Sequence, residues 1–461
     1  MNGGCSLDDT RPCLVPPHPD LLARLQEDPD YVSPPTTSQF AQTRSRPTLS
    51  ARTGTLRGLN DGTIYPDADF VSFASPQHMR EAALRRTPLR GAIRVAVVLA
   101  EFTDRRMRSD AASHFNRIFY SNGSMEHGST TEYFSKVSNG NISLTGEVVG
   151  PVSLQHSLSY YANGNSGKSA SSPNAQNLAA DALDAAKTQI NFKPYDNDGN
   201  GYVDAFIVVH AGSGAEQTGS RGDIWSLKWV LPQVTSVDDV NVYAFLTIPE
   251  DANIGVCAHE IGHLVFGWPD LYDTDASSEG IGNWCLMAGG SWGGTPAGVR
   301  PCHPSAWCKQ NQDWIRVSAP STSQGISLGE VENYGTAYRL WSAGDTSSKE
   351  YFLLENREPV DFDDSLPAPG LLVWHVDDSQ VDNSDETHPK VGLEQADGLN
   401  QLATSTAGRG DSGDPFPGLK GNTSFTSTSN PCSLSYGGRA TGVSITNVSP
   451  ASQTMTMQIS V

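Results

Sequence analysis

Between residues 91 and 316, apolar runs alternate with helical patterns. Residues 93–102 and 204–209 are nearly continuous apolar stretches, which is typical of strands buried on both faces. Residues 178–186 place leucine and alanine at helical spacing, and Ser129-Thr-Thr-Glu132 has the sequence of a helix capping box. Strands that alternate with helices predict an α/β layer in this part of the chain.

The pattern changes from residue 317 onward. Short apolar runs, such as 350–355 and 370–376, are separated by turn residues, and similar runs recur at 443–446 and 455–459. Several short strands with turns between them are typical of an all-β unit. We therefore predict a β-sandwich domain over residues 317–461.

His259, Glu260 and His263 form an H-E-x-x-H motif. On a helix, side chains at i and i+4 project from one side, so the two imidazoles can bind one metal ion with the glutamate beside it. The alternative is a chance occurrence of these residues on a surface helix. The flanking residues argue against chance, because apolar side chains gather on the opposite side of the predicted helix: Ile254, Cys257, Ala258, Ile261, Leu264 and Val265.

We expect this helix to pack its apolar face into a core and to turn its ligands toward a cleft. Asn253 or Asp251 is predicted to cap its start, and Gly267 with Pro269 to end it. The chain then turns back and brings Asp270 toward the metal. Two histidines and one carboxylate leave a fourth position open for water, which indicates catalysis by zinc and not a structural site.

Two other acidic residues lie near enough in the sequence to be alternatives for the third ligand. Asp273 remains an alternative to Asp270, because it lies in the same turn. Glu279 would suit a thermolysin-like site, in which the ligand comes from a second helix, but its Ser-Ser-Glu-Gly setting is not helical.

The region from His259 to Asp273, followed by Gly282-Asn-Trp-Cys-Leu-Met-Ala-Gly-Gly-Ser-Trp292, resembles the immune-inhibitor-A type (M6) metalloproteases of the metzincin clan. The resemblance extends over residues 191–226. It implies a metzincin-like zinc protease domain at 91–316, Met287 in a tight turn under the zinc, an aspartate as third ligand and a β-sandwich companion. This chain departs from the clan spacing, because Gly267 and Asp270 each stand one residue later than usual.

Residues 1–90 are rich in Pro, Ser, Thr and Arg and show little periodicity, so we predict a pro-segment or linker. Secreted proteases commonly carry such a segment to mask the site, as a zymogen. Arg85-Arg86 or Arg90 would be exposed places for its removal. A further hypothesis is that Cys13 binds the zinc in a latent form, since thiolates are good zinc ligands.

A second stretch has the spacing of a calcium loop. Oxygen ligands occupy positions 1, 3, 5 and 9, glycine stands at 6 and a backbone carbonyl at 7: Asp196, Asp198, Asn200, Gly201, Tyr202 and Asp204. Ile207 replaces the usual bidentate glutamate, and a strand follows, so this is not an EF-hand. The alternative is an Asx-rich turn without metal. Calcium here would stabilise the loop and take no part in chemistry.

The formal net charge of −20 argues against nucleic acid as a partner, and no apolar run is long enough to span a bilayer. At 461 residues the length suits about three domains. We expect a monomeric, extracellular protein. The N-terminus lacks the basic start and apolar stretch of a secretory signal, so export would need a signal outside this chain or another route. Four sites of the Asn-x-Ser/Thr type are compatible with secretion: Asn122, Asn141, Asn422 and Asn447.

The chain has seven cysteines, so at least one stays unpaired within it. Cys257 and Cys285 each stand two residues before a landmark of the resemblance, and a disulfide between them is the favoured hypothesis. Cys302 with Cys308, and Cys5 with Cys13, are the next pairs. The alternative is that several are small buried residues.

The sequence thus predicts a secreted zinc endopeptidase that hydrolyses peptide bonds in protein substrates, with Glu260 as the base and Tyr272 as a candidate for oxyanion stabilisation. One alternative is an inactive adhesion or carbohydrate-binding protein with a remnant protease domain. Its support is the β-rich C-terminal part and two Arg-Gly-Asp triplets, which begin at Arg221 and Arg409. A non-proteolytic zinc amidase would use the same ligands.

Overall fold

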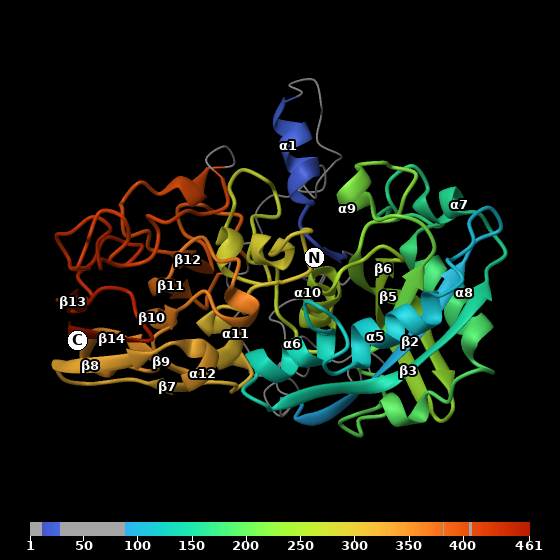
Figure 1. Cartoon of the computed structure of the whole chain (residues 1–461), viewed down its shortest axis with the longest axis horizontal. Helices are drawn as coiled ribbons and strands as arrows, with labels where there is room; N and C mark the ends of the chain where they lie inside the picture. The colour runs from blue at the N-terminus through green and yellow to red at the C-terminus, as the bar shows by residue number, and fades with distance from the viewer. Residues whose placement is uncertain (1–11, 28–87, 381, 405–407) are drawn as a thin grey trace, which may run out of the picture.

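The computed structural model describes residues 12–27, 88–380, 382–404 and 408–461 (Figure 1). Most of the predicted pro-segment, and Cys5 with its predicted partnership to Cys13, lie outside these residues. In Figure 1 the α/β part lies to the right, the β-rich C-terminal part to the left, and helix α10 (Ile254–Leu264) between them.

The α/β part is built on a six-stranded sheet with the order β1-β5-β6-β4-β2-β3. Both apolar runs predicted as buried strands are confirmed, since they form the interior strands β2 and β4. The pairs β2–β3, β2–β4 and β4–β6 are parallel, and β5–β6 and β1–β5 are antiparallel. The strands are β1 (Cys13–Leu14), β2 (Gly91–Glu101), β3 (Ile142–Ser153), β4 (Phe206–His210), β5 (Leu227–Val237) and β6 (Val240–Pro249).

Helices flank this sheet. The predicted capping box is confirmed at the start of α6, where the Ser129 side chain accepts from the Glu132 amide, and the predicted amphipathic helix is α8. Helix α8 packs along β2, β3 and β5, and α10 packs against β5 and β6. The helices here are α1 (Pro19–Glu27), α5 (Ala111–Tyr120), α6 (Thr130–Val137), α7 (Leu158–Ala162), α8 (Ala175–Ala186) and α9 (Ala215–Thr218). No helix in the described part of the chain has the length and apolar character needed to cross a membrane.

The C-terminal part contains two antiparallel-rich sheets, a five-stranded one ordered β12-β11-β10-β9-β7 and a three-stranded one ordered β13-β14-β8. Apolar side chains of both sheets form a common core, which includes Leu354, Val373 and Met457. The elements are β7 (Arg316–Ser318), β8 (Gln324–Gly329), β9 (Thr336–Leu340), β10 (Glu350–Arg357), β11 (Gly370–Asp377), β12 (Val391–Leu393), β13 (Ser444–Thr446), β14 (Thr454–Ser460), α11 (Ala306–Asn311) and α12 (Val331–Tyr334).

Strands β10 and β11 are buried on both faces. Leu353 and Trp374 point to the opposite side from the C-terminal core and join the large core that also contains β2, β4 and α10. Apolar contact therefore continues across the predicted boundary at 316/317. The divisions 1–90, 91–316 and 317–461, and the β-sandwich assignment, stay predictions.

Neither of the predicted disulfides among the described cysteines is formed. Cys257, Cys285, Cys302 and Cys308 are all buried thiols. Cys257 lies on the core side of α10, whereas the Cys285 sulfur accepts hydrogen bonds from the backbone amides of Ser305 (3.2 Å) and Met287 (3.4 Å) and turns toward Cys308. The landmarks are neighbours, as expected, but the two sulfurs face different surroundings.

Candidate metal centre

Helix α10 carries the H-E-x-x-H motif and is buried along its whole length. Its two glycines permit the close packing. A Cβ at Gly255 would lie 1.9 Å from the carbonyl oxygen of Ser291, and one at Gly262 would lie 2.6 Å from the sulfur of Met287. Met287 itself is fully buried. The methionine segment therefore lies directly against the helix that carries the motif, as the resemblance implies.

The two ends of α10 differ in how well they agree with the predicted caps. Asn253 occupies the N-cap position, but its side chain makes no capping bond and donates instead to the carbonyl of Ala297 (2.9 Å). Asn253 therefore occupies the predicted start of the helix, but its side chain is turned to Ala297 and does not cap the backbone. Gly267 has a positive φ of 67° and turns the chain back, which agrees with the predicted end.

The turn at Gly267 brings Asp270 to the two histidines. The Nε2 atoms of His259 and His263 lie 3.1 Å apart, and Oδ1 of Asp270 lies 3.2 and 3.1 Å from them. Ligands held about 2.0–2.1 Å from a tetrahedral zinc are separated by about 3.3 Å. The three atoms are therefore spaced as the ligands of one zinc ion would be.

The protonation of these side chains also suits a cation. Nδ1 of His259 lies 2.9 Å from the carbonyl oxygen of Leu286, and Nδ1 of His263 lies 2.6 Å from that of Trp268. Each Nδ1 must carry the proton to donate this bond, so Nε2 is the nitrogen that, in a neutral ring, offers a lone pair beside the acceptor Oδ1 of Asp270. Three buried lone pairs that meet without a donor are a poor arrangement for protein groups alone and a good one for a metal.

Neither of the other acidic candidates joins this group. Asp273 accepts hydrogen bonds from Ser277 and Ser278 (both 2.8 Å). Glu279 forms an ion pair with Arg409, with 3.0 Å between Oε2 and Nε. Asp270 is thus the carboxylate that the structure brings to the two histidines.

Glu260 lies in the same buried space but makes no hydrogen bond through either carboxylate oxygen. Burial raises its pKa well above the usual value for a glutamate, and the negative charge of Asp270 adds to the rise. A cation bound at the histidines would oppose both effects. This carboxylate is therefore not held by other side chains and can exchange a proton.

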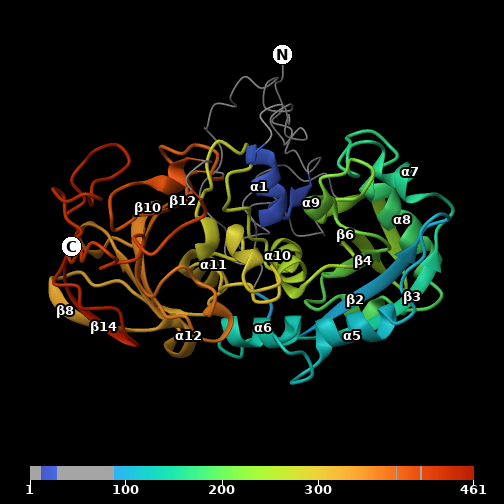
Figure 2. The same cartoon turned by 45° about the horizontal axis from the view of Figure 1, so that its top comes forward.

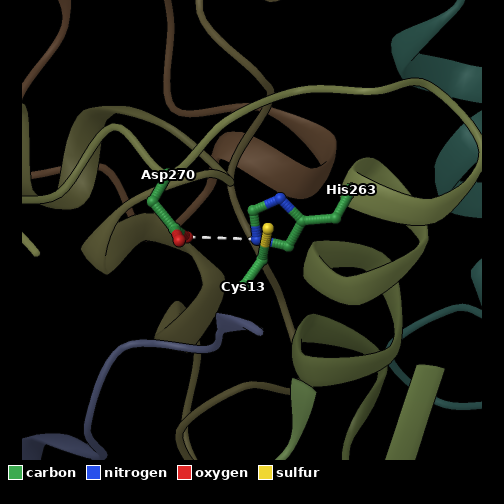
Figure 3. Close-up of side chains that lie close together, drawn as sticks. All are labelled: Cys13, His263 and Asp270. Atoms are coloured by element: carbon green, nitrogen blue, oxygen red, sulfur yellow. Dashed lines mark ion pairs between the residues drawn. The ribbon is translucent and has the colours of Figure 1, made fainter. Parts of the chain in front are cut away.

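The predicted open cleft is the main difference from expectation. His259, Glu260 and His263 are all 0% exposed, and Asp270 is 9% exposed. Strand β1 lies over the ligands, as Figure 3 shows for Cys13 beside His263 and Asp270. The ligand face of α10 does turn away from the apolar core, but part of the N-terminal segment covers it.

Three of the predicted calcium ligands come together. Carboxylate oxygens of Asp196, Asp198 and Asp204 lie within 4.8 Å of one another. Backbone amides hold this loop, since Asp196 accepts from Asn200 (3.0 Å) and Gly201 (2.9 Å). The Oδ1 of Asn200 accepts from the amide of Tyr202 (2.8 Å). Three close acidic groups just before β4 suit a divalent cation.

The sequence predicts no role at the metal centre for three further side chains that lie near it. Trp225, Trp292 and Arg409 each donate to a carbonyl of the segment over the ligands. Trp225 and Trp292 stand in the stretches that carry the resemblance, but no periodic pattern shows where an indole N–H points. Arg409 begins an Arg-Gly-Asp triplet, and its ion pair with Glu279 removes it from the exposed setting that an adhesion motif needs.

Residues 99–319 match the family model described as "Immune inhibitor A peptidase M6, catalytic domain". The chain is 30% identical over 257 residues to "Pre-pro-metalloprotease PrtV" of Vibrio cholerae serotype O1 (strain M66-2), and this match covers 48% of this chain and 27% of that protein. It is also 30% identical over 244 residues to "Immune inhibitor A" of Bacillus thuringiensis subsp. alesti, which covers 44% of this chain and 35% of that protein. These matches support a metalloprotease.

Proposed function

We propose that this chain, whose residues 99–319 match an M6 peptidase catalytic domain, is a zinc-dependent endopeptidase. His259, His263 and Asp270 would hold the zinc. The observation that carries the proposal is the mutual spacing of 3.1–3.2 Å between their ligand atoms, all with lone pairs turned inward. A helix that only supports the fold does not need three ligand atoms that converge on one point.

Glu260 would act as the general base. Zinc, when bound, polarises a substrate carbonyl and lowers the pKa of water into the neutral range. Glu260 takes the proton from the attacking water and returns it to the leaving amine. The role suits a carboxylate that has no other partner and stands one helical position from His259.

The Tyr272 hydroxyl would assist the carbonyl oxygen. It donates to the carbonyl of Leu14 at 3.0 Å, and that same oxygen lies 3.2 Å from Nε2 of His259. A peptide carbonyl can therefore reach both the metal ligands and the Tyr272 hydroxyl. Protein substrates would lie along β5, which is the strand that β1 now covers. An extracellular location remains part of the proposal, and its support is the acidic charge of −20.

The proposal is tested by metal analysis joined to casein digestion. We expect the full-length chain to bind about one zinc ion at the three-ligand site. After limited trypsin treatment it should digest casein, a chelator should abolish digestion, and added zinc should restore it. Digestion that survives complete removal of zinc would overturn the proposal, and so would a fully zinc-loaded, trypsin-treated chain that cleaves nothing.

We also propose that the loop from Asp196 to Asp204 binds calcium. Its support is the closeness of three carboxylates in a loop whose backbone is already held by Asp196. The ion would offset the repulsion between these charges and stabilise the entry to β4. It would lie outside the catalytic chemistry.

Calcium is expected to raise the free energy of unfolding, by about 2.7 kcal/mol at a concentration 100 times the Kd. Asp198→Asn should weaken calcium binding about tenfold, which removes about 1.4 kcal/mol of that gain. Thermal unfolding with and without calcium measures both effects. Asp184→Asn on the exposed side of α8 is the matched control and should leave the calcium effect unchanged. Equal calcium effects in the two variants would contradict the site.

A further inference from the structure

The N-terminal segment enters the metal centre as an added strand. Strand β1 pairs antiparallel with β5, with Cys13 opposite Lys228 and Leu14 opposite Leu227. Helix α1 follows and lies above α10 in the view of Figure 2. Without β1, β5 would be the edge of the six-stranded sheet, which is the place where an extended peptide can add.

Side chains around the candidate metal centre bind the backbone of this segment. Every carbonyl from Leu14 to Pro17 accepts a hydrogen bond from a side chain of the catalytic region or the C-terminal part: Leu14 from Tyr272 (3.0 Å), Val15 from Trp225 (2.8 Å), Pro16 from Trp292 (2.9 Å) and Pro17 from Arg409 (3.3 Å). The amides of Val15 and His18 donate to the carbonyls of Ser226 (3.3 Å) and Glu216 (2.8 Å). Residues 13–18 are therefore bound as a peptide ligand would be.

The side chain of Cys13 lies close to two of the three candidate ligands. Its sulfur, Nε2 of His263 and an oxygen of Asp270 all lie within 4.8 Å of one another, as Figure 3 shows. Zinc takes thiolate sulfur at about 2.3 Å and nitrogen or oxygen at about 2.0–2.1 Å, so sulfur and nitrogen ligands of one tetrahedral ion lie about 3.6 Å apart, and a modest movement of the side chains would let these atoms share an ion. Cys13 is 7% exposed, and water has little access.

The charges favour the same arrangement. A thiolate from Cys13 and the carboxylate of Asp270 together neutralise a doubly charged zinc ion, and the two imidazoles add no charge. A buried site of zero net charge costs much less than one with a surplus positive charge. The carboxylate of Glu260, which is fully buried, stands beside this group.

We propose that Cys13 is the fourth ligand of the metal, and that residues 13–17 thereby keep the centre closed in the full chain. This rests on the proposed function, because it requires the metal to bind at His259, His263 and Asp270. Peptide hydrolysis then needs the thiolate to leave the metal. The indoles of Trp225 and Trp292 become available to substrate carbonyls when the segment leaves.

The test uses the full-length chain loaded with cobalt(II), which replaces zinc in sites of this type. We expect a thiolate-to-cobalt charge-transfer band in the near ultraviolet in the wild type. The band should be lost in Cys13→Ser and kept in Cys432→Ser, a matched control in the C-terminal part. Cys13→Ser should still bind cobalt through the three other ligands and show d–d bands. Its casein digestion without trypsin should exceed that of the wild type about tenfold or more, the effect of about 1.4 kcal/mol.

A second measurement needs no variant. Alkylation of the wild-type chain, followed by peptide mapping, should find Cys13 protected when zinc is bound and modified after chelation. A cobalt-loaded wild type without the thiolate band, or a Cys13 that is alkylated equally in both states, overturns the proposal and leaves the metal centre intact. A chain that binds neither zinc nor cobalt overturns the proposed function as well.

Discussion

Replacing Glu260 with glutamine is expected to lower kcat/KM for peptide hydrolysis by about 10²–10⁴-fold, with zinc content unchanged. Glutamine has the same shape, so it can fill the fully buried position, but it cannot accept a proton from water. Neither oxygen of Glu260 has a structural hydrogen bond to lose. The measurement is hydrolysis of a quenched fluorescent peptide by the trypsin-treated chain, together with zinc analysis.

Glu330→Gln provides the matched control for this loss. Glu330 is also buried, at 2% exposed, but it lies in the C-terminal part and accepts from Asn333 at 2.8 Å. Its replacement should leave hydrolysis unchanged. If Glu260→Gln retained wild-type kcat/KM, the general base would be another group. If it lost its zinc, the carboxylate would be a ligand and the assigned mechanism would be wrong.

Local spacing explains why the cluster of His259, His263 and Asp270 could be predicted. His259 and His263 follow from helix periodicity alone, and Asp270 follows from a turn only a few residues further along. The spacing left Asp273 as an alternative, because a turn of unknown geometry brings either carboxylate near the helix end. In the structure the turn brings Asp270 to the histidines, whereas Asp273 is engaged by Ser277 and Ser278, and ligand spacing alone does not predict this turn geometry.

Long-range contacts explain what could not be predicted. The backbone carbonyls of residues 15–17 accept hydrogen bonds from Trp225, Trp292 and Arg409, and each of these side chains lies more than two hundred residues further along the chain. No periodicity links such positions. The buried strands could be predicted because an apolar run shows the burial of a strand in its own residues. The pairing of Cys257 or Cys285 could not, because it depends on side-chain directions in separate elements.

A buried arginine connects the C-terminal sheet to the metal centre. Arg357, on β10, is fully buried and donates to Asp363 through two nitrogens, at 2.6 and 2.7 Å. It also lies 3.2 Å from both Glu332 and Glu355. A further nitrogen, NH1, donates to the carbonyl of Trp284 (3.2 Å), three residues before Met287. Burial alone would raise the pKa of Asp363, but the Arg357 charge holds it well below its usual range.

Arg357→Met is therefore expected to lower the free energy of unfolding by about 3–5 kcal/mol, because it leaves buried carboxylates without their cation. Urea unfolding measures the loss. Lys193→Met is the control: Lys193 pairs with Asp239, both side chains are exposed (62% and 86%), and losing such a surface pair should cost about 0–1 kcal/mol.

The double variant Arg357→Met with Asp363→Leu separates the charge effect from simple loss of packing. Removing both charges should cost less than the sum of the two single changes, because the second change removes an anion that the first has left uncompensated. Additive losses would show that the pair is not coupled. Since Arg357 also holds the carbonyl of Trp284 beside the methionine segment, the single variant should release zinc at a lower urea concentration than the wild type. Unchanged zinc release alongside reduced stability would confine the role of Arg357 to the C-terminal sheet.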